Sequence, residues 1–74
     1  MNVKERVKEI LEILLDHKID SDDIKSETEE LWDSLKHLEI IVTLEEEFDV
    51  KFNQEDILEL NSMSAIVAKI MELI

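Results

Sequence analysis

Glycine and proline are both absent from this chain of 74 residues. These two residues supply most tight turns between β-strands, because glycine adopts positive φ freely and proline fixes φ at the angle that several turns require. Leucine, isoleucine, glutamate and lysine dominate instead, and most of these are good helix formers. The composition therefore predicts an all-α fold in which polar loops join the helices.

The length and the missing cysteines set further limits. Seventy-four residues allow one domain, which we expect to span residues 1–74, with one small core. The absence of cysteine excludes a disulfide framework, a thiolate metal site and a cysteine nucleophile. No apolar run approaches the roughly 18 residues of a membrane span, and the N-terminus lacks the apolar segment of a signal peptide. We expect a cytoplasmic monomer.

The net charge of −12 argues against a nucleic-acid partner, since a phosphate-binding surface needs clustered lysine and arginine and this chain has eight, widely spread. The acidity is concentrated in residues 19–49, which hold twelve acidic and two basic side chains. Such a negative field speeds association with positively charged partners. We therefore expect basic protein partners.

The first 32 residues predict one helix and one long loop. Asn2, with Glu5 three residues later, resembles a capping box for a helix from Val3 to Asp16 or His17. Its apolar stripe consists of Val3, Val7, Ile10, Leu11, Leu14 and Leu15. Residues 18–32 have no clean helical period and predict an ordered loop. The apolar residues that anchor this loop on the core are Ile19, Ile24, Leu31 and Trp32.

The rest of the chain predicts two long helices with a short one between them. The first runs from about Ser34 to Glu47 and has Asp33 or Ser34 as its N-cap. Its apolar stripe consists of Leu35, Leu38, Ile41, Val42 and Phe48, widened by Ile40 and Leu44. A short helix opens at Asn53 or Gln54 and continues through Leu60. Its predicted inner residues are Ile57, Leu58 and Leu60. After a cap at Asn61-Ser62, the last helix carries Met63, Ile66, Val67, Ile70, Met71 and Ile74 at helical spacing.

Ser34 is the most accessible candidate for chemistry, because a residue at the start of a helix lies at the edge of the element. A nucleophilic serine needs a base oriented by a third group, and although His37 lies one turn away, no third residue completes such a set. We therefore predict neither catalytic residues nor an enzyme. Asp20, Asp22 and Asp23 lack the EF-hand pattern, so any divalent cation binding there is weak and incidental, and we predict no metal site.

An extended motif places Ser34 in a known context. Asp33-Ser34-Leu35, then Leu38-Glu39-Ile40-Ile41-Val42, then Leu44-Glu45-Glu46-Glu47-Phe48 resembles the acyl carrier protein family. The resemblance implies a four-helix bundle with a long first loop and a short third helix. It also implies that 4′-phosphopantetheine is attached to Ser34, beside Asp33 and Leu35, and that its thiol carries acyl groups as thioesters. A separate phosphopantetheinyl transferase performs the attachment, using coenzyme A and a divalent metal.

The same resemblance makes residues 34–47 the recognition helix for acyl-loading and acyl-processing enzymes with basic docking patches. The matching contact positions are Leu35, Lys36, Glu39, Val42, Glu45 and Glu46. The chain departs from the family at Lys36, where an acidic residue is common, at Leu31-Trp32, where a small residue or glycine is common, and at Asn53, where proline is usual. These departures favour a dedicated pathway, in lipid or secondary metabolism, at least as strongly as general fatty-acid synthesis. The alternative function is an acidic helical adaptor without a prosthetic group.

Overall fold

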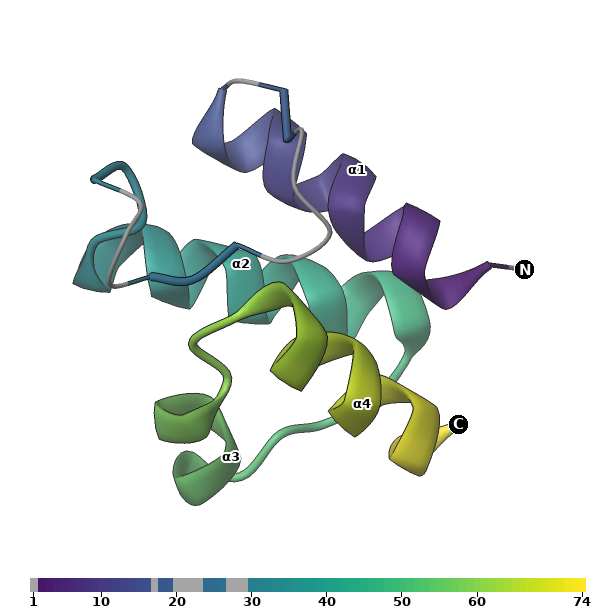
Figure 1. Cartoon of the computed structure of the whole chain (residues 1–74). Helices are drawn as coiled ribbons and strands as arrows, with labels where there is room; N and C mark the ends of the chain where they lie inside the picture. Colours follow the sequence, from purple (N-terminus) through teal and green to yellow (C-terminus); the bar gives the residue numbers. More distant parts are fainter. Residues whose placement is uncertain (1, 17, 20–23, 27–29) are drawn as a thin grey trace.

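The computed structural model describes residues 2–16, 18–19, 24–26 and 30–74 (Figure 1). These residues form four helices: α1 (Val3–Leu15), α2 (Ser34–Phe48), α3 (Gln54–Glu59) and α4 (Met63–Leu73). The described ranges contain no β-strand beyond one isolated bridge between Lys25 and Ser62. The predicted all-α bundle, with a long first loop and a short third helix, is confirmed. No helix in the described ranges is long and apolar enough to cross a membrane.

The helix ends show how a chain without glycine begins and stops its helices. The Asn2 side chain accepts the Glu5 N–H at 3.1 Å, which confirms the predicted cap, although between these two described residues the reciprocal capping-box bond is not formed. α1 stops at Leu15, a residue or two earlier than predicted, and α2 continues one residue further, to Phe48. Both end on aspartates in the left-handed region, Asp16 at φ 58° and Asp49 at φ 53°. Aspartate tolerates this conformation better than most residues, so it takes the place that glycine usually holds.

The core lies between α1, α2 and α4 (Figure 1). The inner face of α1 is buried as its periodicity predicts, and the first loop contributes the buried side chains of Ile19 and Trp32. Met63 N–H donates to the Ile24 carbonyl at 2.9 Å, and Ser26 N–H donates to the Asn61 carbonyl at 2.8 Å. The described part of the loop is therefore tied to the connection before α4. The predicted loop residues 20–23 and 27–29, and the predicted helix end at His17, lie outside the described residues.

The predicted apolar stripe of α2 is wrong in part. Ile40, Ile41 and Leu44 are buried and Phe48 is partly buried, whereas Leu35, Leu38 and Val42 are 75%, 55% and 52% exposed. Helical spacing alone could not separate them, because α2 has one apolar face toward the core and a second toward solvent. Four other predicted core residues are also exposed: Leu31, Leu58, Met71 and Ile74.

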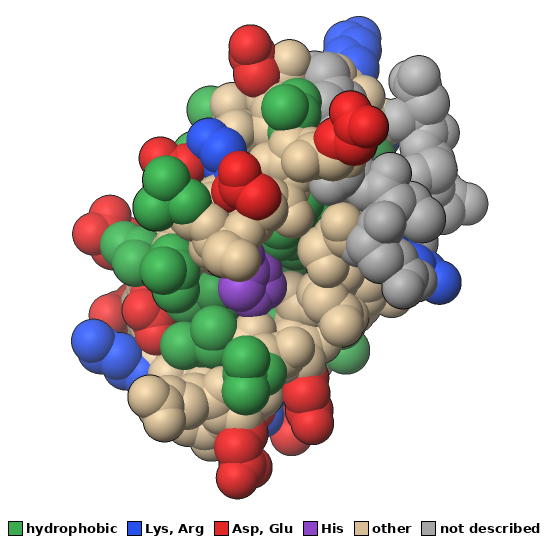
Figure 2. Space-filling view, turned by 90° about the vertical axis from the view of Figure 1, so that its left-hand side faces the viewer, with side chains coloured by type: hydrophobic (Ala, Val, Ile, Leu, Met, Phe, Trp, Pro, Cys, Tyr) green, Lys and Arg blue, Asp and Glu red, His purple; other side chains and the backbone are tan. Residues whose placement is uncertain are grey.

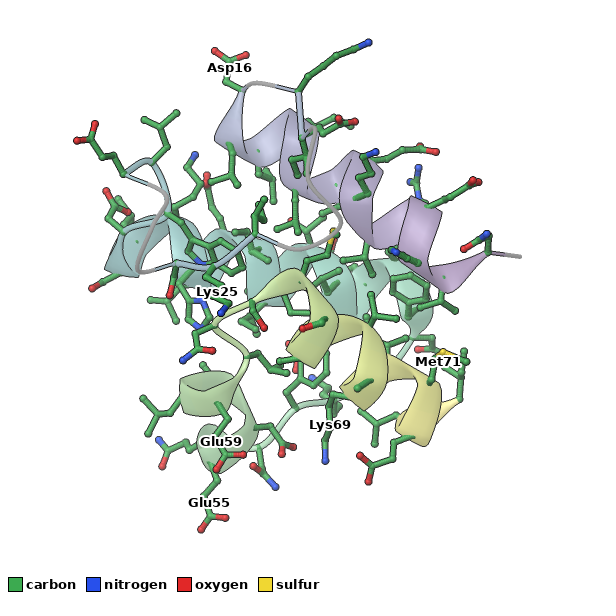
Figure 3. The ribbon with its side chains drawn as sticks, in the orientation of Figure 1. Asp16, Lys25, Glu55, Glu59, Lys69 and Met71 are labelled. Atoms are coloured by element: carbon green, nitrogen blue, oxygen red, sulfur yellow. The ribbon has the colours of Figure 1, made fainter. Side chains whose placement is uncertain are left out.

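α3 is held at its ends and by polar contacts more than by burial. Asn53 is its N-cap in a full capping box with Asp56, and the helix itself has no buried residue. It ends at Glu59, one residue before the predicted Leu60, which is buried as the C-cap. Lys69 Nζ on α4 lies 3.2 Å from the Asp56 carboxylate of α3, and that hydrogen bond raises the pKa of Lys69. Figure 3 labels Lys69 on α4.

A second ion pair joins α1 to α2. Arg6 Nη2 lies 2.7 Å from Glu47 Oε1, while Arg6 Nη1 lies 2.9 Å from Glu9 Oε2. The hydrogen bond from Arg6, assisted by its charge, lowers the pKa of Glu47 from its ordinary value. A carboxyl whose pKa is lower in the folded state binds fewer protons there than in the unfolded chain. Its contribution to stability is therefore present above the unfolded pKa and is lost as the pH falls through the folded one.

We expect Glu47→Gln to lower the melting temperature at neutral pH, and the difference from the parent to close as acid protonates Glu47 in the parent. Thermal melts followed by circular dichroism over a pH series measure this. Glu46→Gln is the matched control, because it removes the same charge from the exposed side of α2 and so reports any relief of charge repulsion. Identical curves for the two variants would contradict a stabilising Arg6–Glu47 pair.

Candidate functional site

Ser34 is the first residue of α2, and its neighbour Asp33 performs the capping. Asp33 has extended backbone, and its Oδ1 accepts the Lys36 N–H at 2.8 Å. The sequence left Asp33 and Ser34 as alternative caps, and the structure selects Asp33. The Ser34 side chain is exposed, and among the described residues its hydroxyl has no hydrogen-bond partner. The cap therefore leaves a serine hydroxyl available at the positive end of a fifteen-residue helix.

A cavity of about 460 Å³ opens beside Ser34, between the start of α2 and α3. Its apolar wall consists of Trp32, Leu38, Ile57 and Leu58, and His37 and Asn61 add polar groups. On this face of the molecule, hydrophobic side chains gather around a histidine, with acidic side chains among and around them (Figure 2). The exposed serine thus lies next to a partly apolar hollow that is open to solvent.

His37 connects the two sides of this cavity. The Trp32 Nε1–H donates to His37 Nδ1 at 2.9 Å, and His37 Nε2 lies 2.7 Å from the Ile57 carbonyl. Indole nitrogen only donates and a carbonyl only accepts, so the imidazole must be neutral with its proton on Nε2. The two rings are stacked at 6.1 Å between centroids. Because both ring nitrogens are engaged, this arrangement offers Ser34 no free imidazole nitrogen as a base.

Sequence reasoning identified only part of this arrangement. Trp32 was predicted to fill the core, and it is 4% exposed. The sequence indicates His37 only as a possible base for Ser34 and gives no sign of its link to α3, because a contact across twenty residues leaves no local pattern. Leu38 and Leu58 were assigned to the core, but both are exposed and line the cavity. The sequence does contain one signal of an exposed apolar surface: α2 has more apolar residues than one buried face can hold.

The six predicted contact residues all lie on α2, but their environments differ. Leu35, Glu39, Val42 and Glu46 are exposed. Lys36 Nζ forms an ion pair with Glu39 Oε2 at 2.7 Å, so Lys36 partly neutralises a predicted docking acid. Glu45 is half-buried, and its Oε2 accepts the Phe52 N–H at 2.9 Å, which gives it a structural role at the turn after α2.

The described residues include no group of three or more His, Cys, Asp or Glu side chains that could hold a metal ion. The loop aspartates considered as a weak cation site, Asp20, Asp22 and Asp23, lie outside the described ranges. The geometry at Ser34 suits a phosphate ester better than a metal ion, because unpaired N–H groups at a helix start favour an attached or bound phosphate. The exposed hydroxyl and the open cavity leave room for a flexible arm beyond that phosphate.

Comparison with known proteins identifies the family. Residues 3–70 match the family described as the phosphopantetheine attachment site. The chain therefore belongs to the acyl carrier protein family of phosphopantetheine-dependent carriers, and its prosthetic group is covalent 4′-phosphopantetheine. Over 42 residues it is 40% identical to an "Acyl carrier protein homolog" of Mycoplasma pneumoniae (strain ATCC 29342 / M129 / Subtype 1). That match covers 57% of this chain and 50% of the relative, so it spans about half of the relative's length.

Separate substitutions distinguish the cap from the exposed serine. Asp33→Ala should lower the free energy of unfolding by about 0.5–2 kcal/mol, because it leaves the Lys36 N–H without its acceptor. Ser34→Ala should change it by no more than about 0.5 kcal/mol, as expected for an exposed side chain with little to lose. Urea unfolding followed by circular dichroism measures both values. Asp33→Asn keeps the capping oxygen and controls for charge; a larger loss in Ser34→Ala than in Asp33→Ala would assign the cap to Ser34.

Proposed function

We propose that Ser34 carries the 4′-phosphopantetheine arm and that the chain presents acyl cargo on this arm to partner enzymes. The observation that supports this proposal most directly is the exposed Ser34 hydroxyl at the first position of α2, next to a cap formed by Asp33 and without a hydrogen-bond partner in the described part of the chain. Membership of the phosphopantetheine attachment family supplies the group that such a hydroxyl accepts.

The chain's own groups stabilise the attached phosphate without activating the serine. A phosphodiester on Ser34 would lie beside the N–H groups of Ser34 and Leu35, which precede the capped Lys36 N–H and have no acceptor within the helix, at the positive end of the helix dipole. Activation of the hydroxyl is left to a phosphopantetheinyl transferase, which agrees with the engagement of both His37 nitrogens elsewhere. When bound, the group supplies a terminal thiol that holds acyl cargo as a thioester.

The exposed apolar face of α2 and α3 supplies the contact for partners. Leu35, Leu38 and Val42 on α2 and Leu58 on α3 present apolar area that the fold does not bury. Figure 2 shows acidic side chains among the hydrophobic ones on the face around the histidine, and the chain carries a net charge of −12. A partner with an apolar centre and a basic rim would bury the leucines and meet opposite charge, so such charges steer association.

The pathway is inferred from the residues around Ser34. The Mycoplasma relative is named as an acyl carrier protein homolog, which supports acyl cargo for this chain. Lys36, paired with Glu39, reduces the negative charge one turn into α2, and Trp32 occupies a buried position directly before the capping Asp33. We propose a single-domain carrier for a dedicated lipid or secondary-metabolite pathway, with general fatty-acid synthesis as the alternative.

The attachment itself is tested by intact mass after incubation with coenzyme A, magnesium and a broad-specificity phosphopantetheinyl transferase. The parent should gain the mass of one arm, and Ser34→Ala should gain none. Ser64→Ala is the matched control, since Ser64 is an exposed serine in the first turn of α4, and it should be modified like the parent. A folded parent that stays unmodified with several transferases would favour an acidic adaptor without a prosthetic group.

Lys36→Glu tests the docking face. The substitution breaks the pair with Glu39 and adds a second acid, so a housekeeping enzyme with a basic patch should use the loaded variant several-fold faster at low salt. The gain should shrink as salt screens it, and stability should change by no more than about 1 kcal/mol. A dedicated partner with an acid facing Lys36 should instead lose activity.

Lys4→Glu on α1 makes the same change of net charge on a different helix, whose start lies across the molecule from that of α2 (Figure 1). Steady-state rates for the three proteins at two ionic strengths are compared. Equal gains for Lys4→Glu and Lys36→Glu would show that total charge, and not the α2 face, determines the rate.

A further inference from the structure

The position of α3 depends on few contacts. It has six residues, none of them buried, and a helix of this length is not stable on its own. The side-chain bonds that join it to other helices in the described structure are the Asp56–Lys69 ion pair to α4 and the His37–Ile57 bond to α2. The His37 bond is the one at the cavity beside Ser34.

The same imidazole also holds the segment that leads into Ser34. Trp32 lies two residues before Ser34, is 4% exposed, and donates its Nε1–H to His37 Nδ1. We call the Trp32 indole, the His37 ring and the Ile57 carbonyl the His37 bridge. It joins the end of the first loop, the first turn of α2 and the middle of α3 through one side chain.

We propose that neutral His37 is a positioning residue: it holds Trp32 and α3 on either side of Ser34 and so fixes the face that a phosphopantetheinyl transferase must bind. The inference rests on the proposed attachment at Ser34. Loss of the His37 bridge should therefore weaken binding of the transferase and leave the chemistry at the Ser34 hydroxyl unchanged, since both ring nitrogens of His37 are bound to Trp32 and Ile57.

The His37 bridge requires an uncharged ring. A protonated imidazole carries N–H on both nitrogens, so its Nδ1–H would face the Trp32 Nε1–H, and indole has no acceptor to offer. The bond from Nε2 to the Ile57 carbonyl survives this change. Acid should therefore release Trp32 while α3 keeps its contact with His37.

The charged groups around His37 are few. Asp33 is the charged side chain that lines the cavity, and its Oδ1 is bound to the Lys36 N–H. On α2, Lys36 is paired with Glu39, and on α3 the lining residues Ile57 and Leu58 are apolar. Asp56 of α3 is paired with Lys69 of α4. Asp33 is therefore the charged residue of the cavity lining whose titration must be controlled.

Three variants separate hydrogen bonding from shape. His37→Gln keeps one acceptor and one donor and does not titrate between about pH 5 and 8, where imidazoles do. His37→Phe keeps an aromatic ring and loses both bonds. Trp32→Phe removes the donor together with part of the buried ring, keeps the His37–Ile57 bond, and remains informative if His37→Phe does not fold. All three retain Asp33 and His17.

The first readout is the emission of Trp32, which is the chain's one tryptophan in a sequence without tyrosine. Protonation of His37 in acid should change the parent's emission in one reversible step, because Nδ1 can then no longer accept the Trp32 Nε1–H. His37→Gln should show no such step, because its amide stays neutral. A step of equal size in His37→Gln would assign it to Asp33 or another acid and overturn the pH requirement.

The second readout is the KM of the transferase for this protein, measured near pH 8. Trp32→Phe should raise KM about two- to tenfold with kcat unchanged, the size expected for one lost hydrogen bond that acts only on binding. His37→Phe, which loses both bonds, should raise KM at least as much. His37→Gln should stay within about twofold of the parent. Equal KM values for all four proteins, or a Gln variant as impaired as the Phe variant, would overturn the proposal.

A parent that accepts no arm would refute the proposed function instead, and the emission step would still decide whether the His37 bridge exists.

Discussion

The hydrogen bond from the Lys36 N–H to Asp33 Oδ1 determines where α2 begins, and the rest of the site depends on that position. Because Asp33 takes the cap, Ser34 becomes the first helical residue and keeps its hydroxyl exposed. Every later residue of α2 is then placed by helical geometry: Ile40, Ile41 and Leu44 are buried in the core, while Leu35, Leu38 and Val42 face solvent. The Asp33 cap therefore determines both which residues of α2 enter the core and which remain exposed to solvent.

This double use of α2 is possible because other elements complete a small core. α1 supplies one wall and is tied to α2 by the Arg6–Glu47 pair, α4 supplies another, and Trp32 and Ile19 from the first loop fill the remaining space. The exposed apolar face of α2 lowers the solubility of the protein, and the high net negative charge offsets this effect. An exposed apolar surface bordered by acids is typical of a site that contacts other proteins.

The sequence predicted those features that depend on neighbouring residues. The helices and most of their caps follow from local patterns: Asn2, Asn53 and Ser62 all accept the N–H three residues later. The family and its prosthetic group followed from the motif around Ser34, and the family match confirms them. The choice between Asp33 and Ser34 as cap could not be made, since both side chains can accept the same bond.

Features that depend on distant residues could not be predicted in this way. Leu58 has the spacing of a core residue, but α3 is too short to cover it. The bond from His37 to the Ile57 carbonyl joins helices whose relative position is set by the whole core, so neither residue alone indicates it. Lys36 and Glu39 have the i, i+3 spacing at which oppositely charged side chains pair on a helix. Because each is a predicted contact residue, their pairing reduces the charge that both present to a partner.

The central claim is that the arm is attached to Ser34, and the most direct measurement is its location on the loaded protein. Proteolysis followed by tandem mass spectrometry, with fragmentation mild enough to keep the phosphodiester, identifies the modified side chain. The account predicts that the arm is on Ser34 alone, within the peptide that also contains Trp32 and Asp33. An arm found on Ser26, Ser62, Ser64 or any other hydroxyl would contradict it.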